Sequence, residues 1–207
     1  MSNKIGIIDY GLCNLLNVKN AIKYLGANAE IIDTPESIEN QSHIILPGVG
    51  AFKNGMRGLI IRNLVDSIKN HVLDDKPFLG ICLGMQMMLN KSYEYGEIEG
   101  LNLVDGEVIK IPNRNSANKK HKIPHIGWNE INYQNNKSKK ISNNKSVYFV
   151  HSYMANCKDK ENVIATTDYN GVKIEAIINN KSAYGCQFHP EKSGDAGLDI
   201  LNNFINL

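Results

Sequence analysis

The first hundred residues alternate short apolar runs with longer stretches in which apolar residues recur every three or four positions. Short apolar runs are typical of buried strands, and the wider spacing is typical of amphipathic helices. The runs predict strands over residues 4–9, 30–33, 43–46 and 77–81, and the spacing predicts helices over 15–25 and 58–73. Strands that are apolar throughout and alternate with helices indicate a largely parallel sheet covered by helices on both faces.

The pattern changes after about residue 100, where short β-type segments follow one another. These segments span residues 103–109, 130–133, 147–150, 163–166, 174–178 and 183–188, and a last apolar pattern predicts a closing helix over 197–207. Asn179-Asn180 is a plausible hairpin turn between the last two strands. The sequence therefore predicts one α/β domain over residues 1–207, with an antiparallel β portion in its second half.

Composition narrows the class of protein. A length of 207 residues suits one domain, and a net charge of +2 gives no reason to expect a nucleic acid or a membrane surface as a partner. The N-terminus lacks a signal-peptide core, and no apolar run approaches the length of a membrane span. The four cysteines lack the paired spacing of a metal site. We expect a cytoplasmic protein that holds neither a metal nor a cofactor.

Two stretches, residues 113–122 and 134–145, are rich in Lys, Asn and Ser. The simpler interpretation is that they are solvated surface loops. Docking to an acidic partner or to a nucleic acid is the alternative, and the weak net charge and the lack of interleaved aromatic residues count against a nucleic acid.

The segment Gly80-Ile81-Cys82-Leu83-Gly84 joins an apolar strand to a helical run. The same layout holds the nucleophile of α/β hydrolases on a strained strand-to-helix turn, where flanking glycines allow close backbone approach. A thiol at a helix N-terminus is favoured as the thiolate, the nucleophilic form. Cys82 is therefore a candidate nucleophile, and a buried structural cysteine is the alternative.

His189-Pro190-Glu191 follows the last apolar strand. Proline keeps the residue before it extended, and residues two apart in an extended chain point the same way. Glu191 is then expected to accept a hydrogen bond from one ring nitrogen of His189, which leaves the other nitrogen as a base. A nucleophile on an elbow with such a histidine is typical of a catalytic triad.

Attack on a carbonyl also requires donors for the developing oxyanion. The backbone N–H of Leu83, next to the nucleophile, is one candidate. The Pro47-Gly48-Val49-Gly50 segment follows a strand, and the N–H of Val49 or Gly50 is a second.

These pieces together resemble the class I glutamine amidotransferases, and more narrowly the glutaminase subunits of imidazole glycerol phosphate synthases. The resemblance covers nearly the whole chain. It is carried by Ile8-Asp9-Tyr10-Gly11 with Asn14-Leu15, by the elbow, and by four further blocks, Leu46-Pro47-Gly48-Val49-Gly50-Ala51-Phe52, Pro124-His125-Ile126-Gly127-Trp128-Asn129, Tyr148-Phe149-Val150-His151-Ser152-Tyr153 and Gln187-Phe188-His189-Pro190-Glu191-Lys192-Ser193.

The resemblance implies a flavodoxin-like three-layer fold and hydrolysis of L-glutamine to glutamate and ammonia. By similarity, the catalytic triad is Cys82, His189 and Glu191. The residues that hold glutamine by similarity are Gln86, Glu94, His151, Ser152 and Tyr153. Trp128 and Lys192 are implied to face a (β/α)8-barrel synthase subunit, which receives the ammonia and makes imidazole glycerol phosphate in histidine biosynthesis.

Alternatives remain at this point. The family usually has Gly where Cys13 stands, and that turn is implied to lie near the partner. A related amidotransferase subunit that serves a sugar for surface polysaccharide is therefore the second hypothesis. A non-catalytic scaffold on the same fold is the third, against which the intact Cys82, His189 and Glu191 argue.

Overall fold

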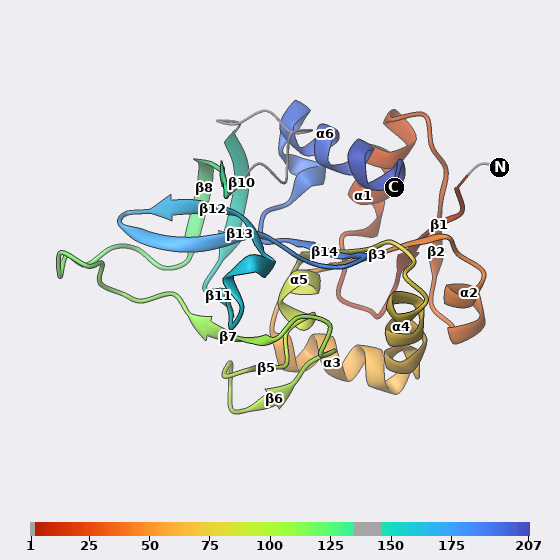
Figure 1. Cartoon of the computed structure of the whole chain (residues 1–207), viewed down its shortest axis with the longest axis horizontal. Helices are drawn as coiled ribbons and strands as arrows, with labels where there is room; N and C mark the ends of the chain where they lie inside the picture. The colour runs from red at the N-terminus through yellow and green to blue at the C-terminus, as the bar shows by residue number, and fades with distance from the viewer. Residues whose placement is uncertain (1–2, 135–145) are drawn as a thin grey trace.

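An eight-stranded sheet runs through the computed structural model, which describes residues 3–134 and 146–207 (Figure 1). Its strands lie in the order β2 (Ala29–Ile32), β1 (Ile5–Ile8), β3 (His43–Gly48), β4 (Phe78–Cys82), β14 (Ala183–Cys186), β13 (Val172–Asn180), β12 (Val163–Tyr169) and β9 (Asn132–Tyr133). The pairs from β2 to β14 are parallel, and those from β14 to β9 are antiparallel. The predicted mixed α/β sheet is confirmed.

Helices cover both faces of this sheet (Figure 1). On one face, α1 (Leu15–Tyr24) and α6 (Gly194–Ile205) pack over one apolar cluster. On the other, a second cluster includes residues of α2 (Pro35–Glu39), α3 (Phe52–Ile61), α4 (Leu64–Leu73) and α5 (Leu83–Met87). The three layers bury the parallel strands β1, β3 and β4 at every position, as their largely apolar sequences require, whereas the edge strand β2 exposes Glu30 and Ile31.

The predicted helix over 58–73 is wrong, because two helices occupy this region. Asn63 takes a left-handed backbone conformation with φ of 58°, and the helix breaks there between α3 and α4. The closing helix also begins three residues earlier than predicted, at Gly194.

Two smaller sheets lie beside the main sheet. One has the order β11 (Tyr153–Cys157), β7 (Gly106–Lys110), β5 (Lys91–Ser92) and β6 (Ile98–Glu99), and the other pairs β8 (His125–Glu130) with β10 (Ser146–His151). The single strand predicted over 130–133 is wrong, because this range holds the last residue of β8 and the whole of β9. The predicted Asn179-Asn180 turn is wrong, because both residues pair with β14 and the chain turns at Lys181-Ser182.

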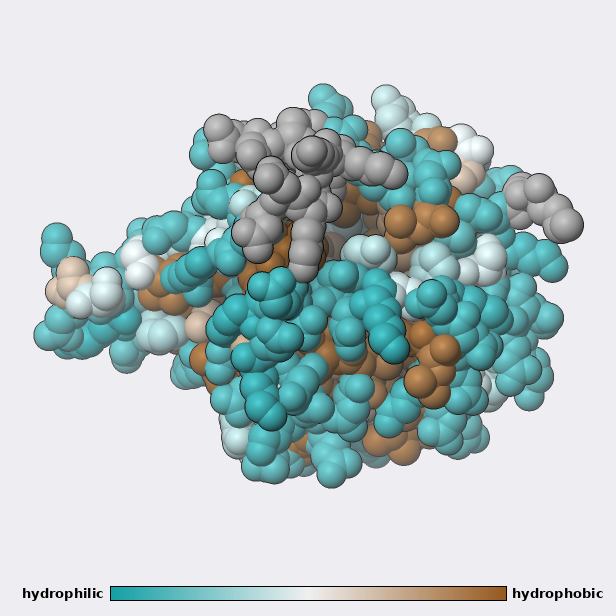
Figure 2. All heavy atoms as spheres, in the orientation of Figure 1, coloured by the Kyte–Doolittle hydropathy of each residue, from teal (hydrophilic) through white to brown (hydrophobic). Residues whose placement is uncertain are grey.

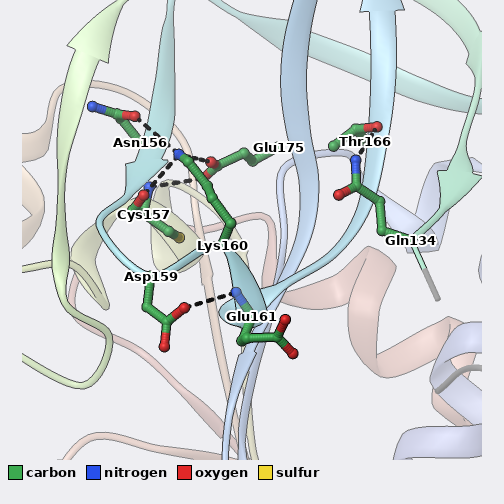
Figure 3. A network of polar contacts seen from close by, with 8 residues as sticks. All are labelled: Gln134, Asn156, Cys157, Asp159, Lys160, Glu161, Thr166 and Glu175. Carbon is green, nitrogen blue, oxygen red and sulfur yellow. Dashed lines mark hydrogen bonds and ion pairs between the residues drawn. The ribbon is translucent and has the colours of Figure 1, made fainter.

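A polar network joins β11 to the neighbouring β13 (Figure 3). The buried Glu175 of β13 accepts the N–H of Cys157 at 2.9 Å, and its other oxygen lies 2.9 Å from the Lys160 ammonium. The same ammonium donates to the Cys157 carbonyl at 2.7 Å. These bonds fix the last residue of β11 against the main sheet. The first residue of the same strand, Tyr153, lines the site described below.

The segment between β7 and β8 extends away from the sheets (Figure 1) and its visible surface is mostly hydrophilic (Figure 2). Residues 113–122 within it are mostly exposed, as predicted for a surface loop. Of the second predicted loop, over 134–145, only Gln134 lies inside the described residues. Within the described ranges, the helices are too short or too polar to cross a membrane.

Candidate active site

The chain turns sharply between β4 and α5, with Cys82 at the turn. Cys82 has φ of 53° and ψ of −106°, a conformation that side chains with a Cβ rarely adopt. The flanking glycines permit it: a Cβ on Gly80 would lie 2.7 Å from the backbone of Gly84, and a Cβ on Gly84 would overlap the Leu46 carbonyl. The elbow therefore presses α5 against β3 and β4 and fixes the direction of the Cys82 side chain.

His189 reaches the same edge of the sheet because β14 lies parallel and next to β4. Its backbone is extended, and its Nδ1 lies 2.8 Å from Oε1 of Glu191. The route to this contact differs from the predicted one, since Glu191 lies in a 3-10 turn, η3 (Pro190–Lys192), and not in an extended segment. Both side chains are buried, at 3% and 2% exposure.

The surroundings of His189 favour its charged form. Burial lowers the pKa of His189, but the neighbouring Cys82 sulfur and the Glu191 carboxylate outweigh burial and raise that pKa to about 10. Glu191 occupies Nδ1, and among the described residues Nε2 has no hydrogen bond of regular geometry. An imidazole fixed in this way can hold a proton beside the sulfur, and an acid group supports its charge.

A cavity of about 330 Å³ opens beside these groups at the carboxyl ends of β3 and β4. It is lined by Val49, Gly50, Cys82, Leu83, Gln86, Glu94, Pro124, Val150, His151, Ser152, Tyr153 and His189. Ten of the predicted site residues are in that set. Glu191 is not, because it lies behind His189. A larger cavity of about 880 Å³ lies near the start of β4, beside Pro77 and Ser182, and includes none of the predicted site residues.

The sequence from residue 6 to residue 207 matches the family described as glutamine amidotransferase class-I. The chain belongs to this family.

Curated relatives are similar to it over their whole length. The chain is 47% identical to imidazole glycerol phosphate synthase subunit HisH 1 of Legionella pneumophila (strain Lens), over 99% of this chain and 100% of the relative. It is 47% identical to subunit HisH of Caldanaerobacter subterraneus subsp. tengcongensis, over 97% and 96% of the two chains. The subunit HisH of Methanothermobacter thermautotrophicus is 42% identical, with 98% of both chains covered.

Solved structures share the fold at low sequence identity. One described as a glutamine amidotransferase has a TM-score of 0.76 at 16% identity and covers 98% of this chain and 99% of its own. PurLQS from Thermotoga maritima has a TM-score of 0.74 at 19% identity and covers 100% and 99%. The class I glutamine amidotransferase fold implied by the motifs is confirmed.

One candidate oxyanion donor of this amidotransferase is already occupied. The N–H of Val49 donates to the Leu12 carbonyl at 3.1 Å, so it cannot donate to a ligand while that bond is intact. The thiol of Cys13 donates to the Pro47 carbonyl at 3.5 Å, which is a second contact that holds the segment 47–50 in place. Gly50, with φ of +100°, and Leu83 remain as candidate donors on the cavity wall.

The residues predicted to hold glutamine are themselves held by the protein. Oε2 of Glu94 accepts the N–H of Phe52 at 2.7 Å, at the start of α3, which fixes the carboxylate on the cavity wall. His151 is buried against His125, with Nε2 of His151 3.1 Å from Nδ1 of His125. Burial lowers the pKa of His151 to about 3, so this part of the wall is neutral at ordinary pH.

Gln86 leads to a residue that the sequence interpretation missed. Nε2 of Gln86 donates to the Tyr153 carbonyl at 2.9 Å and to Oε1 of Gln187 at 3.0 Å. Gln187 is fully buried, and its own Nε2 donates to the Cys82 sulfur at 3.7 Å. The sequence offered one indication of Gln187, because it is a single amide side chain between apolar neighbours directly after the strand predicted to be buried.

Trp128 and Lys192 do not line the cavity; Trp128 lies on β8, whose Ile126 pairs with Val150 on the cavity wall. Trp128 is 57% exposed and pairs with Tyr148 across β8 and β10. The N–H of His189 donates to the Tyr148 carbonyl at 3.0 Å, which places the exposed Lys192 of η3 near the same strand. Ile126, also 57% exposed, extends the apolar part of this surface along β8.

Proposed function

We propose that this chain is the glutaminase subunit of an imidazole glycerol phosphate synthase, with Cys82, His189 and Glu191 as its catalytic triad. One observation supports the triad above the others: a cysteine on a strained elbow faces a buried histidine whose second nitrogen is bonded to a buried carboxylate. The relatives that carry the name of this synthase subunit support the pathway. They disfavour a sugar as acceptor.

The reaction follows from the placement of these groups. The Cys82 thiolate attacks the side-chain amide carbon of L-glutamine, and the carbonyl electrons move to oxygen. Backbone N–H groups at Leu83 and Gly50 stabilise that oxyanion, at roughly 3 kcal/mol per donor. When the tetrahedral intermediate collapses, the C–N bond breaks, and His189 gives its proton to the departing ammonia.

A thioester on Cys82 remains. His189, now neutral, removes a proton from water, and the resulting hydroxide attacks the thioester carbon. Glutamate leaves, and the sulfur returns as thiolate beside protonated His189. Glu191 stabilises the positive imidazole in both half-reactions and keeps Nε2 directed at the sulfur.

Ammonia has to reach its acceptor before it takes up a proton from water. We therefore propose that a (β/α)8-barrel synthase subunit docks on the surface formed by Ile126, Trp128 and Lys192. Exposed Ile and Trp side chains beside a cavity are typical of a protein interface. We also propose that the protein acts in the reducing cytoplasm, which is consistent with the free thiols of Cys13, Cys82, Cys157 and Cys186.

The test uses the complex of this chain with its barrel subunit. Cys82→Ala should abolish glutamine-dependent synthesis of imidazole glycerol phosphate and leave ammonium-dependent synthesis at the wild-type rate. Cys157→Ala is the matched control, because Cys157 is a buried cysteine at the far end of β11 from Tyr153, and it should keep glutaminase turnover within a few-fold of wild type. Glutamine hydrolysis by Cys82→Ala would contradict the triad. A wild-type complex that forms but makes no imidazole glycerol phosphate would contradict the proposed acceptor.

A further inference from the structure

Gln187 places its side-chain amide against the sulfur of Cys82. It follows β14 directly, its exposed fraction is zero, and its backbone N–H donates to the Ala176 carbonyl at 2.9 Å. Its Nε2 lies 3.7 Å from the Cys82 sulfur. A fully buried amide needs partners for its polar atoms, and one of the partners here is the nucleophile itself.

Neighbouring groups decide which end of this amide faces the sulfur. The Tyr153 carbonyl can only accept a hydrogen bond, so the Gln86 atom 2.9 Å away must be its nitrogen. The second hydrogen of that nitrogen points to Gln187, where it requires an acceptor at 3.0 Å, which is Oε1. The nitrogen of Gln187 is therefore the end that faces Cys82. A backbone carbonyl on the cavity wall imposes the orientation of both amides.

We propose that Gln187 is a further catalytic residue, whose amide N–H stabilises negative charge on the Cys82 sulfur and holds the sulfur in its attacking position. The inference rests on the proposed function, since it takes Cys82 as the nucleophile. Gln187 forms and breaks no covalent bond. Its contribution is greatest when the sulfur is a thiolate, because hydrogen bonds to a charged acceptor are about twice as strong as neutral ones. It therefore acts at the start of the reaction and again when the thioester is released.

The same network defines what Gln86 can offer to glutamine. Both hydrogens of its side-chain nitrogen are used, by Tyr153 and by Gln187. Gln86 is then left with its oxygen, so it accepts a hydrogen bond from the substrate and does not donate one. A ligand that pulled Gln86 out of this arrangement would also release the amide that faces the sulfur.

Alkylation of Cys82 tests the proposal without glutamine. The rate of carbamidomethylation by iodoacetamide is measured at Cys82 by peptide mass spectrometry between pH 5 and pH 10. Gln187→Met keeps the size and removes the donor, and should slow alkylation at pH 7 by about 10-fold, the lower end for loss of a hydrogen bond to a charged group. Gln187→Glu keeps the acceptor for Gln86 but turns an oxygen toward the sulfur. It should move the midpoint of the pH profile upward by about one unit or more.

Gln41→Met is the matched control, because Gln41 is also a buried amide, 6% exposed, and donates to the Ser37 carbonyl at 3.1 Å on α2. Its alkylation profile should equal the wild-type profile. In the complex, both Gln187 variants should lower the kcat of glutaminase at least 10-fold with little change in the KM for glutamine, and keep ammonium-dependent synthesis. The proposal would be overturned if both Gln187 variants had the alkylation profile of the wild type. It would also be overturned if Gln41→Met slowed alkylation or lowered kcat as much as the Gln187 variants do.

A measurement on the unaltered protein covers the case in which a variant does not fold. The side-chain amide ¹⁵N–¹H signals of Gln187 should shift when Cys82 is alkylated, while those of Gln41 stay in place. Unshifted Gln187 signals would also overturn the inference. Glutaminase activity retained by Cys82→Ala would instead contradict the proposed function, so the two failures are distinguishable.

Discussion

His189 and Glu191 meet at 2.8 Å between the imidazole Nδ1 and the carboxylate Oε1, in a buried contact between the residue that precedes the 3-10 turn η3 and a residue within it. The carboxylate helps to raise the pKa of His189 to about 10. Glu191→Gln keeps the size but removes the charge, so the pKa of His189 should fall and its ring should lose its fixed orientation. We expect kcat for glutamine hydrolysis to drop by about 10²- to 10⁴-fold in the complex.

The pKa of His189 in this variant is read from its imidazole ¹⁵N signals across a pH titration. Glu36→Gln, on the exposed side of α2, serves as the control and should behave as wild type in both assays. A Glu191→Gln enzyme with more than half of the wild-type kcat would show that the carboxylate has no part in turnover.

The parallel half of the fold could be predicted from the sequence because its inner strands β1, β3 and β4 are buried at every position and are therefore almost entirely apolar. The second half could not be predicted equally well. Strands β5, β6 and β9 are two residues long, and in β8 exposed residues alternate with the buried His125 and the half-buried Gly127 and Asn129. Two-residue strands are defined by pairing with other strands of the fold and are too short to leave a periodic pattern in the sequence.

The site shows the same division. Cys82, His189 and Glu191 lie in short local motifs, so the sequence suffices to propose them as a triad, and the structure brings them together. The engagement of the Val49 N–H depends on the Leu12 carbonyl, and the orientation of Gln187 depends on Tyr153 through Gln86. Such contacts join segments far apart in the chain, so only the folded structure reveals them.

Trp128 should be a major determinant of affinity for the barrel subunit. It is 57% exposed and lies on the same strand as Ile126, beside the cavity. Large aromatic side chains that become buried in an interface commonly contribute more than 1 kcal/mol each. We expect Trp128→Ala to raise the Kd of the complex by about 10-fold or more, measured by titration calorimetry.

Leu73→Ala is the matched control for this prediction. Leu73 is 81% exposed at the end of α4, beside the larger cavity near the start of β4. Its replacement should leave the Kd within a factor of two. A Trp128→Ala chain that binds as tightly as wild type would place the docking surface elsewhere.

Gly84→Ala should destabilise the protein although Gly84 lies in a helix. Alanine normally favours a helix by about 1 kcal/mol over glycine. At this position its Cβ would overlap the Leu46 carbonyl, a backbone atom of β3 that cannot rotate away. We expect the free energy of unfolding in urea to fall by about 3 kcal/mol or more, the upper range for overpacking.

Gly26→Ala separates this collision from backbone strain. Gly26 has φ of +81° and open space where a Cβ would be placed, so only the left-handed backbone disfavours alanine there. That strain costs about 1 kcal/mol. Equal losses in the two variants would show that the elbow relaxes to admit a methyl group.

His71 should make the protein sensitive to acid. It is 3% exposed on α4, and its Nε2 lies 3.1 Å from the Pro77 carbonyl. Burial lowers the pKa of His71 to about 4, whereas an unfolded histidine titrates near 6.5. Between these two pKa values the folded state binds fewer protons than the unfolded state. The stability that the neutral His71 contributes is therefore fully present above pH 6.5 and is lost as the pH falls from 6.5 through 4.

Between pH 8 and pH 5 this difference corresponds to about 2 kcal/mol of unfolding free energy from His71 alone. His71→Gln keeps a donor for the Pro77 carbonyl and removes the titration, so the stability lost over that interval in urea denaturation should shrink by about 2 kcal/mol. His121→Gln, in the surface loop before β8, should lose as much stability as wild type. Burial also lowers the pKa values of His43, His125 and His151, so part of the acid loss remains in the His71 variant. An acid loss unchanged in His71→Gln would show that protonated His71 finds water or a partner in the folded protein.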